Sequence, residues 1–447
     1  MSTFAETRVE ILGGIGMIGG SVILVSTPKA RVLLDFGMRG LNQGLLRSPS
    51  GPRPGYELVD LLRAQELPDA PGIYDPAQLT LDPTLAAARA AAADPRPTAV
   101  FLSHAHIDHE GALGFLDPSI AVYASVDTVK MLDALNDTGQ PRPGRTLRPI
   151  PVAEGERIQL EDITVEVVLV EHDVPGASGI IVTTPEGTLV YTGDINFHRN
   201  EGRRSHAFAE RIRGVEMLVT ETTMLSHGKG NDRPVRSEAE IDEIFTATLQ
   251  RVPGLVLLSA YSRDVERAVR LIELARRNGR EVIWPSRDAA LLHAMGATNV
   301  SSWAPGRPEQ DPRPLPESVN RVSMEQVVAE PGRYVVQPDG HDAPALADLP
   351  VVAASTVWVH SQGEPLGPFM PNWHVFQDWL GKLGIDVVAA GSSGHATRAD
   401  LLKFIEFVAP GCVVPIHGTR PEDVEVSVAR LLPEYGAVYR LDGSVVE

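Results

Sequence analysis

The sequence predicts a mixed α/β protein in which one α/β domain is inserted into another. The first part of the chain is rich in short β segments that Gly or Pro soon closes. From about Ser237 the pattern changes to alternating helices and strands, which is typical of a parallel α/β layer. The last part, from about residue 386, returns to the first pattern. With 447 residues, the chain is long enough for two or three domains and a sizeable buried core.

The β segments at the start favour an antiparallel meander over a β-α-β unit, because turn residues rather than a helix separate them. In the first part we expect strands at 9–12, 22–25, 31–34, 98–102, 163–170, 179–183, 188–191 and 215–219, and helices at 59–64, 85–93 and 126–135. Further along we expect helices at 238–250, 265–278 and 398–408, and strands at 254–258, 281–283, 333–336, 356–359, 387–390 and 412–416. The proline-dense segment 303–316 predicts a connecting loop.

Composition narrows the environments and the kinds of site that this chain can have. No segment approaches the roughly 18 apolar residues that a membrane span needs, and the N-terminus lacks the pattern of a signal peptide. We therefore expect a cytoplasmic protein with no membrane partner. The one cysteine, Cys412, excludes a disulfide framework and a thiolate-rich zinc site. Any metal must therefore be held by histidine and carboxylate.

The formal net charge of −18 argues against a protein that coats nucleic acid by bulk electrostatics, because phosphate binding uses Lys and Arg. It does not exclude a local basic channel. The arginines between Arg199 and Arg213 fit such a channel, and they fit a solvated surface segment equally well.

A glycine motif near the N-terminus imitates a dinucleotide site. Residues 14–19 read GIGMIG and fit the G-x-G-x-x-G pattern after a strand. A dinucleotide site needs a helix that begins at these glycines, so that its N-terminus faces the pyrophosphate. Residues 21–28 are instead rich in β-branched side chains and end at a proline, which predicts a strand. We therefore expect the glycines to form a turn or to allow the close approach of another loop.

The segment SHAHIDH at 103–109 concentrates metal-binding side chains directly after a hydrophobic strand. Four such groups crowd one loop, where their mutual desolvation and repulsion would be costly without a cation. Imidazole nitrogen with carboxylate oxygen is a typical donor set of zinc, and manganese or iron also use it. The segment therefore predicts a metal site.

The motifs of this chain resemble those of a known family. HAHIDH at 104–109 resembles the H-x-H-x-D-H signature of metallo-β-lactamase-fold hydrolases. Other segments resemble the β-CASP branch of nucleases and, within it, the RNase J subgroup, so that the resemblance covers essentially the whole chain. These segments are GGIGMIGGS at 13–21, LDFGM at 34–38, VTETT at 219–223, SSGHA at 392–396 and PIHGT at 415–419.

This resemblance implies a metallo-β-lactamase αββα sandwich with an inserted α/β β-CASP domain. The first part of the sandwich would comprise residues 1–225, the β-CASP domain residues 226–385, and the remainder of the sandwich residues 386–447. The sequence ends about thirty residues after His417, and we expect no counterpart of the extra C-terminal domain of typical RNase J.

The resemblance also implies two zinc ions per chain, with manganese as an alternative. The implied ligands of the first ion are His104, His106 and His172. Those of the second ion are Asp108, His109 and His417. Asp194 would bridge the two ions.

Catalysis is assigned by the same resemblance to Asp108, Asp194, His395 and Glu221. Hydroxide would attack phosphorus and leave a 5′-phosphate on the downstream product. His395 would stabilise charge at the scissile phosphate or protonate the leaving 3′-oxygen, and Glu221 would hold its ring and raise its pKa. The alternative is that Glu221 is an N-cap or surface acid and that His395 is a histidine at a helix N-terminus.

We expect the substrate to be single-stranded RNA. Ser392, Ser393 and Gly394, with the backbone amides of the helix start that follows, would bind one RNA phosphate. Ser262 and Arg263, in a similar strand-to-helix loop, would touch a second phosphate, although a cap or buried salt bridge explains them equally.

The activity implied is that of a two-metal ribonuclease, 5′-3′ exonuclease or endonuclease or both, which could form a homodimer. One alternative is a metallo-β-lactamase-fold hydrolase of a small ester or thioester, which predicts a short chain without the α/β insertion. Another is a non-catalytic RNA-binding scaffold, which predicts a broken ligand set.

Overall fold

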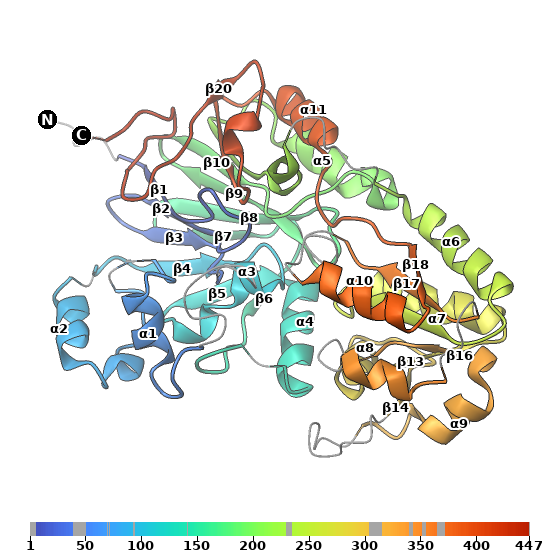
Figure 1. Ribbon diagram of the computed structural model, residues 1–447. Helices are drawn as coiled ribbons and strands as arrows, with labels where there is room; N and C mark the ends of the chain where they lie inside the picture. Colours follow the sequence, from blue (N-terminus) through green and yellow to red (C-terminus); the bar gives the residue numbers. More distant parts are fainter. Residues whose placement is uncertain are drawn as a thin grey trace, which may run out of the picture. The chain divides into compact units, whose positions relative to one another are not determined.

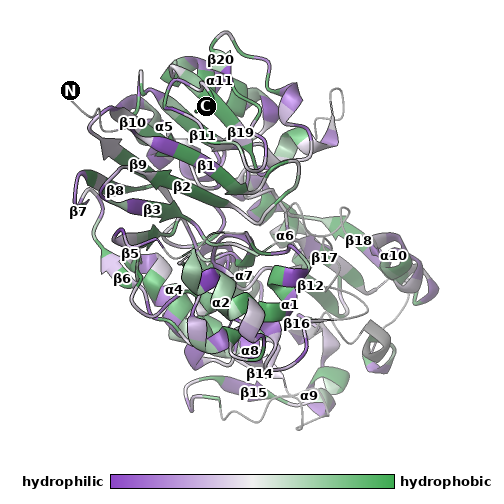
Figure 2. Ribbon diagram, turned by 90° about the vertical axis from the view of Figure 1, so that its left-hand side faces the viewer, coloured by the Kyte–Doolittle hydropathy of each residue, from purple (hydrophilic) through white to green (hydrophobic). Residues whose placement is uncertain are grey.

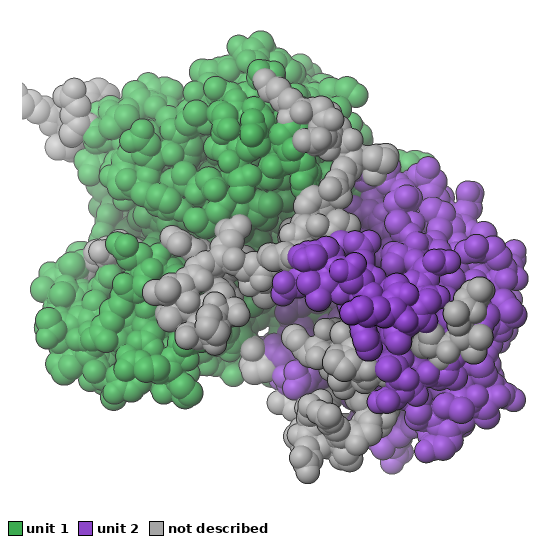
Figure 3. Space-filling view, in the orientation of Figure 1, with its two compact units in different colours: residues 1–132, 141–233, 395–447 green, residues 133–140, 234–394 purple. Residues whose placement is uncertain are grey.

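The computed structural model describes residues 6–38, 51–68, 70, 72–92, 94–140, 142–228, 235–303, 315–338, 343–350, 355–363 and 372–446. The chain forms two compact units, which Figure 3 distinguishes by colour. Unit 1 comprises residues 1–132, 141–233 and 395–447, and unit 2 comprises residues 133–140 and 234–394. Most of unit 2 is therefore one insertion in the sequence of unit 1. The domain boundaries after residues 225 and 385 stay predictions.

Unit 1 contains two β-sheets, and both mix antiparallel and parallel strands. The first sheet has the strand order β1 (Arg8–Gly13), β2 (Val22–Ser26), β3 (Arg31–Leu34), β4 (Thr98–Phe101), β5 (Ala121–Ser125) and β6 (Ile150–Val152). β1, β2 and β3 pair antiparallel, which confirms the predicted meander, and β3 to β6 pair parallel. The second sheet has the order β20 (Ala429–Arg430), β19 (Cys412–Ile416), β11 (Met217–Glu221), β10 (Gly187–Tyr191), β9 (Ser178–Thr184), β8 (Ile163–Leu169) and β7 (Arg157–Leu160).

The core of unit 1 lies between these sheets. One cluster of buried apolar residues takes members from both, such as Val25 and Leu34 from the first sheet and Val165 and Val182 from the second. Figure 2 shows the strands mostly in the colour of hydrophobic residues, whereas the helices outside them mix both colours. Burial of this apolar surface is the main favourable contribution to folding.

Helices cover both outer faces of the sandwich (Figure 1). Those beside the first sheet are α1 (Glu57–Arg63), α2 (Pro83–Ala91), α3 (Ile107–Glu110) and the start of α4 (Val126–Asp137). Those beside the second sheet are α5 (Arg203–Arg211) and α11 (Arg398–Val408). A Cβ atom at Gly179 of β9 would lie 2.3 Å from the Phe208 ring, so the glycine lets α5 lie directly on the sheet. The result is the αββα sandwich that the sequence predicts.

Two exposed arginines of the arginine-rich segment of unit 1 pair with glutamates, which favours the surface-segment interpretation over a basic channel. Arg199 is 1% exposed and therefore fits neither the channel nor the solvated segment. Arg203 pairs with Glu201 at 2.8 Å, and Arg211 pairs with Glu166.

Unit 2 is built on one parallel sheet, as the alternating pattern predicts. Its strand order is β15 (Asn320–Val322), β14 (Ser301–Trp303), β13 (Glu281–Trp284), β16 (Tyr334–Val336), β12 (Val256–Ala260), β17 (Val357–Ser361) and β18 (Asp386–Ala389). Its helices are α6 (Glu238–Arg251), α7 (Val265–Arg277), α8 (Ser286–Ala294), α9 (Met324–Ala329) and α10 (Trp373–Lys382). Ser237 is the N-cap of α6 and forms a capping box with Glu240. The first helix of unit 2 therefore begins where the sequence pattern changes. Within the predicted loop 303–316, Trp303 ends β14, and residues 304–314 lie outside the described residues.

Short 3₁₀ helices connect several of these elements. They are η1 (Pro76–Leu79), η2 (Leu113–Phe115), η3 (Arg199–Gly202), η4 (Thr223–His227), η6 (Pro331–Arg333), η7 (Ala343–Asp348) and η8 (Pro421–Asp423).

In the described part of the chain, no helix is long and apolar enough to cross a membrane.

The core of unit 2 can be tested at Leu257, which is fully buried in β12 and packs in one cluster with Val336 and Leu380. We expect Leu257→Ala to lower the free energy of unfolding by about 2–5 kcal/mol, because it removes buried methyl groups and leaves a cavity. The five tryptophans of the chain all lie in unit 2, so tryptophan fluorescence during denaturant unfolding reports on this unit. Val269→Ala, at a side chain that is 40% exposed, is the control and should change stability by less than about 0.5 kcal/mol. Equal effects of the two substitutions would contradict the assigned core.

Candidate metal centre

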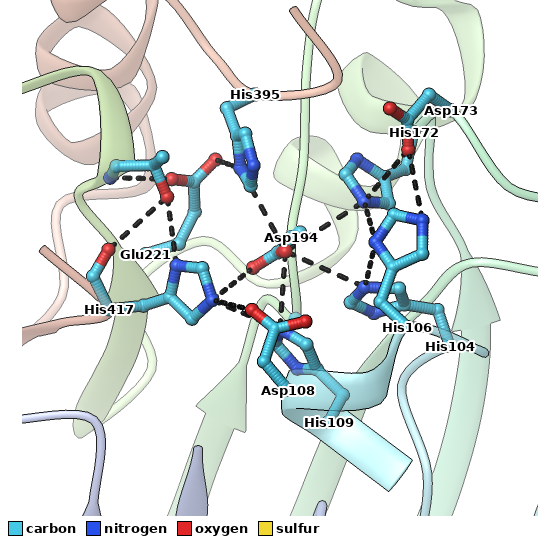
Figure 4. Close-up of polar contacts among 12 residues, drawn as sticks. His104, His106, Asp108, His109, His172, Asp173, Asp194, Glu221, His395 and His417 are labelled. Carbon is cyan, nitrogen blue, oxygen red and sulfur yellow. Dashed lines mark hydrogen bonds and ion pairs between the residues drawn. The ribbon is translucent and has the colours of Figure 1, made fainter. Parts of the chain in front are cut away.

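The carboxyl ends of several strands of unit 1 bring the predicted metal ligands together (Figure 4). His104 and His106 follow β4, and His172 follows β8. Asp194 and His417 follow β10 and β19, which lie on either side of β11 in one sheet and run parallel to it. Because parallel strands end at the same sheet edge, residues far apart in the sequence meet there. Asp108 and His109 reach the same place from α3.

Three imidazoles form the first group of donors. The Nδ1 atom of His106 lies 3.1 Å from Nε2 of His104 and 3.2 Å from Nε2 of His172. The Asp194 carboxylate lies beside them, with Oδ2 at 3.5 Å from Nε2 of His104. These four residues each offer one ligand atom to a common point. This is the first group that the sequence predicts.

Asp108, His109 and His417 form the second group. Nε2 of His417 lies 3.1 Å from Nε2 of His109 and 3.1 Å from Oδ2 of Asp108. Oδ2 of Asp194 lies 3.2 Å from Nε2 of His109 as well. The Asp194 carboxylate therefore stands between the two groups, where a bridging ligand would stand.

The outer nitrogens of three of these histidines have oxygen partners of their own. Ser103 Oγ lies 2.9 Å from Nδ1 of His104, and Thr223 Oγ1 lies 2.8 Å from Nδ1 of His417. Asp35 Oδ2 lies 2.7 Å from Nδ1 of His109. An acceptor on the outer nitrogen keeps the inner nitrogen free of a proton and orients the ring toward a metal. The donor set thus fits two divalent cations.

Asp35 organises this surrounding network and was not among the predicted site residues. Its buried carboxylate also accepts hydrogen bonds from the Ser103 backbone N–H and hydroxyl, both at 2.7 Å, and from the Tyr191 hydroxyl at 2.9 Å. The sequence contained a signal, because a carboxylate at the end of a hydrophobic strand is costly to bury without partners. Nothing in the sequence indicated which partners these would be.

At His104 and Asp194, electrostatics favour the protonation states that bind metal. Burial lowers the pKa of His104 well below its usual value, and the neighbouring imidazoles lower it further, so this ring is neutral. Burial tends to raise the pKa of Asp194, but His109 and His417 outweigh it and hold the pKa well below its usual value. Metal ligation needs neutral imidazole and ionised carboxylate.

His109 shows the excess of negative charge in the centre. Burial lowers its pKa, yet Asp194, Asp108 and Asp35 together raise that pKa well above the usual value. Three carboxylates around one ring therefore favour a positive charge at this point, which a proton or a divalent cation can supply.

Glu221 and His395 form a buried pair beside the two groups. Nδ1 of His395 lies 3.2 Å from Oε1 of Glu221 and 3.8 Å from Oδ2 of Asp194. Burial lowers the pKa of His395, but the two carboxylates outweigh it and raise the pKa to about 10. The Thr223 backbone N–H donates to the second oxygen of Glu221 at 2.8 Å, so the carboxylate is fixed at both oxygens. Glu221 is thus a buried acid at the end of β11 rather than a surface acid.

The residues expected to bind RNA phosphates belong to unit 2. Ser262 lies in the loop between β12 and α7, where its hydroxyl donates to Asp288 at 2.8 Å; Arg263, beside it, is half-buried. Ser392, Ser393 and Gly394 follow β18 and are buried. The helix α11 begins at Arg398, as the sequence predicts, and is capped by Thr397, so no helix begins at the serines themselves. The backbone amides of that helix start therefore do not adjoin the serines in sequence.

The glycine motif belongs to the metal centre. Residues 14–19 join β1 to the antiparallel strand β2, so no helix begins there and no dinucleotide site results. Gly19 has a φ of +84°, and a Cβ atom there would lie 2.7 Å from the Asp108 side chain. The Gly14 carbonyl accepts a hydrogen bond from the His417 backbone N–H at 2.8 Å. The glycines allow close approach, as predicted. The residues that they approach, Asp108 and His417, are two of the predicted metal ligands.

Comparisons with known proteins agree with this architecture. Residues 71–252 match the family of the beta-lactamase superfamily domain, and residues 384–424 match that of the Zn-dependent metallo-hydrolase RNA specificity domain. Ribonuclease J of Pyrococcus abyssi is 24% identical over 92% of this chain and 89% of its own length. Ribonuclease J of Sinorhizobium meliloti is 26% identical over 91% of this chain and 68% of its own length. A crystal structure of a protein of unknown function from Enterococcus faecalis has 28% identity and a TM-score of 0.78, and the match covers 99% of this chain and all of that one.

The two-sheet sandwich with its histidine and aspartate centre defines a protein of the metallo-β-lactamase fold. With the inserted parallel α/β unit and the relatives named above, the chain is RNase J-like and resembles the β-CASP branch of that fold.

The glycine loop gives a test of the metal centre. Gly19→Ala should displace the Asp108 carboxylate and lower the amount of tightly bound zinc, measured by elemental analysis after dialysis. Gly16→Ala is a matched control, because Gly16 also has a positive φ, of +65°, but a methyl group at that position would have nothing within 4 Å. If both variants retain zinc equally, the close approach does not matter for metal binding.

Proposed function

We propose that this chain is a two-metal ribonuclease that hydrolyses phosphodiester bonds of single-stranded RNA. Its relatives named Ribonuclease J support a ribonuclease activity. The observation that carries the proposal is the proximity of seven converging metal donors to the buried pair of His395 and Glu221. The donors alone suit many hydrolases of this fold. His395, which Glu221 holds in place, lies within 4 Å of the Asp194 carboxylate. It adds a group that can stabilise charge on a phosphate and donate a proton to the leaving oxygen.

The proposed ligands are those predicted from the sequence. His104, His106 and His172 would hold one divalent cation, Asp108, His109 and His417 a second, and Asp194 both. Zinc suits these donors, and manganese is the alternative. When bound, the two cations would supply Lewis-acid activation of water and stabilisation of charge on the phosphoryl oxygens.

The role proposed for His395 is proton transfer and charge stabilisation at the scissile phosphate. Nδ1 of His395 is hydrogen-bonded to Glu221, so the proton that the ring can donate to the substrate is the one on Nε2. A protonated ring can stabilise a phosphate oxygen and then donate that proton to the leaving 3′-oxygen. Glu221 keeps the ring in place and favours its protonated form.

Recognition of the RNA chain is assigned in this proposal to unit 2. Ser262 and Arg263, and Ser392, Ser393 and Gly394, would each contact one backbone phosphate. The proposal also includes three further points. The cleavage is that of a 5′-3′ exonuclease, an endonuclease or both, the chain can form a homodimer, and the protein is cytoplasmic.

His395 gives the sharpest test of the chemical step. We expect His395→Ala to lower the cleavage rate of single-stranded RNA by about 10²–10⁴-fold, the usual contribution of general acid–base catalysis, with bound metal unchanged. The measurement is single-turnover cleavage of 3′-labelled RNA, together with metal analysis. His374→Ala, at an exposed histidine of α10, is the control. Full activity in His395→Ala would remove this residue from the mechanism.

The 5′ end of the substrate tests the mode of cleavage. We expect RNA with a 5′-monophosphate to be degraded faster than the same RNA with a 5′-hydroxyl, because an exonuclease that starts at the 5′ end recognises that phosphate. Equal rates with internal products would identify an endonuclease. No cleavage of any RNA by fully metal-loaded protein would favour the small-ester hydrolase or the RNA-binding scaffold instead.

A further inference from the structure

A carboxylate that belongs to neither donor group lies against the first one. Oδ1 of Asp173 is 3.3 Å from Nε2 of His106 and 3.3 Å from Nε2 of His172, as the dashed lines of Figure 4 show. Its side chain is 15% exposed, and it follows His172 directly in the loop after β8. Asp173 is not among the ligands predicted above or among the residues that converge on either metal position.

The position of Asp173 matters because of how His106 is turned. The Nδ1 atom of His106 faces the other two imidazoles at 3.1 and 3.2 Å, so Nδ1 is its ligand atom. A neutral imidazole that ligates through Nδ1 must carry its proton on Nε2. That is the atom beside the Asp173 carboxylate. A carboxylate there stabilises the tautomer that leaves Nδ1 free to bind a cation.

The other histidines show that such partners are a regular feature of this centre. Ser103, Asp35 and Thr223 hold the outer nitrogens of His104, His109 and His417. His106 differs because it turns its Nε2 outward, and Asp173 occupies the corresponding place.

We propose that Asp173 is a positioning residue of the first metal site, which fixes the Nε2-protonated tautomer of His106 and raises the affinity of the site for a divalent cation. The proposal rests on the metal centre of the proposed function but not on RNA as the substrate. Outer partners of this kind usually contribute about 10–100-fold in metal affinity.

The test is a titration of metal-free full-length protein with Co²⁺ in competition with a chelator, followed by the visible absorption of the bound ion. His172→Ala and His417→Ala, which each remove one ligand, assign the two binding steps to the first and second groups. We expect Asp173→Ala to weaken the first step about 10–100-fold and to leave the second step unchanged. Asp173→Asn should recover much of the affinity, because its amide oxygen can take the place of the carboxylate oxygen beside Nε2.

Asp127→Ala is the matched control, since it makes the same change at an exposed position of α4. A first step within twofold of the parent in Asp173→Ala would overturn the proposal. So would a changed coordination number at saturation, because that would make Asp173 a ligand instead. Thermal unfolding of the metal-free variants shows whether each is folded.

The titration also separates this proposal from the proposed function. If the parent binds two Co²⁺ ions and Asp173→Ala weakens the first, the positioning role stands even if no RNA is cleaved. If RNA is cleaved but Asp173→Ala binds Co²⁺ like the parent, only the positioning role falls. A parent that binds no Co²⁺ would overturn both the metal centre and the positioning role.

Discussion

The unfavourable burial of like-charged and polar groups at one edge of the sandwich is the constraint on which the structure depends. Three carboxylates surround His109, and the imidazoles of His106, His109 and His172 crowd around His104. Such a cluster is costly in a buried place unless positive charge compensates it and every outer atom has a partner. The surrounding serine, threonine and aspartate side chains supply the partners, and the inner atoms converge where a cation would supply the charge. The strands that carry these residues must therefore end together.

The sandwich satisfies that constraint through its topology. β10, β11 and β19 are adjacent and parallel, although about two hundred residues separate the last from the others in the sequence. The return of the chain after unit 2 places His395 and His417 beside Glu221 and Asp108. Glycines keep the loops close enough, since Gly37 could not accept a Cβ atom 1.7 Å from the Asp108 carbonyl oxygen. Unit 2 contributes a separate parallel sheet with its own core.

Thr223 links the metal ligands to the proposed acid–base pair. Its hydroxyl contacts Nδ1 of His417, and its backbone N–H contacts Glu221, which in turn holds His395. The geometry of the second donor group and the orientation of His395 are thus set by neighbouring residues on one short segment after β11. Preorganisation of this kind lowers the cost of aligning catalytic groups when substrate arrives.

The sequence by itself determined the class of fold, the alternation of helices and strands, and the donors in HAHIDH, because these depend on local periodicity and on side-chain chemistry within a few residues. It could assign His172, Asp194 and His417 only by resemblance, since these residues lie from about 60 to over 300 positions after HAHIDH and no local signal joins them to it. The burial of Arg199 was likewise not foreseen. Only the tertiary structure decided which ring nitrogen of each histidine faces the metal position. It also decided which oxygen contacts the other ring nitrogen, as at Asp35, Thr223 and Asp173. Those choices depend on ring orientation between packed strands, which sequence spacing does not encode.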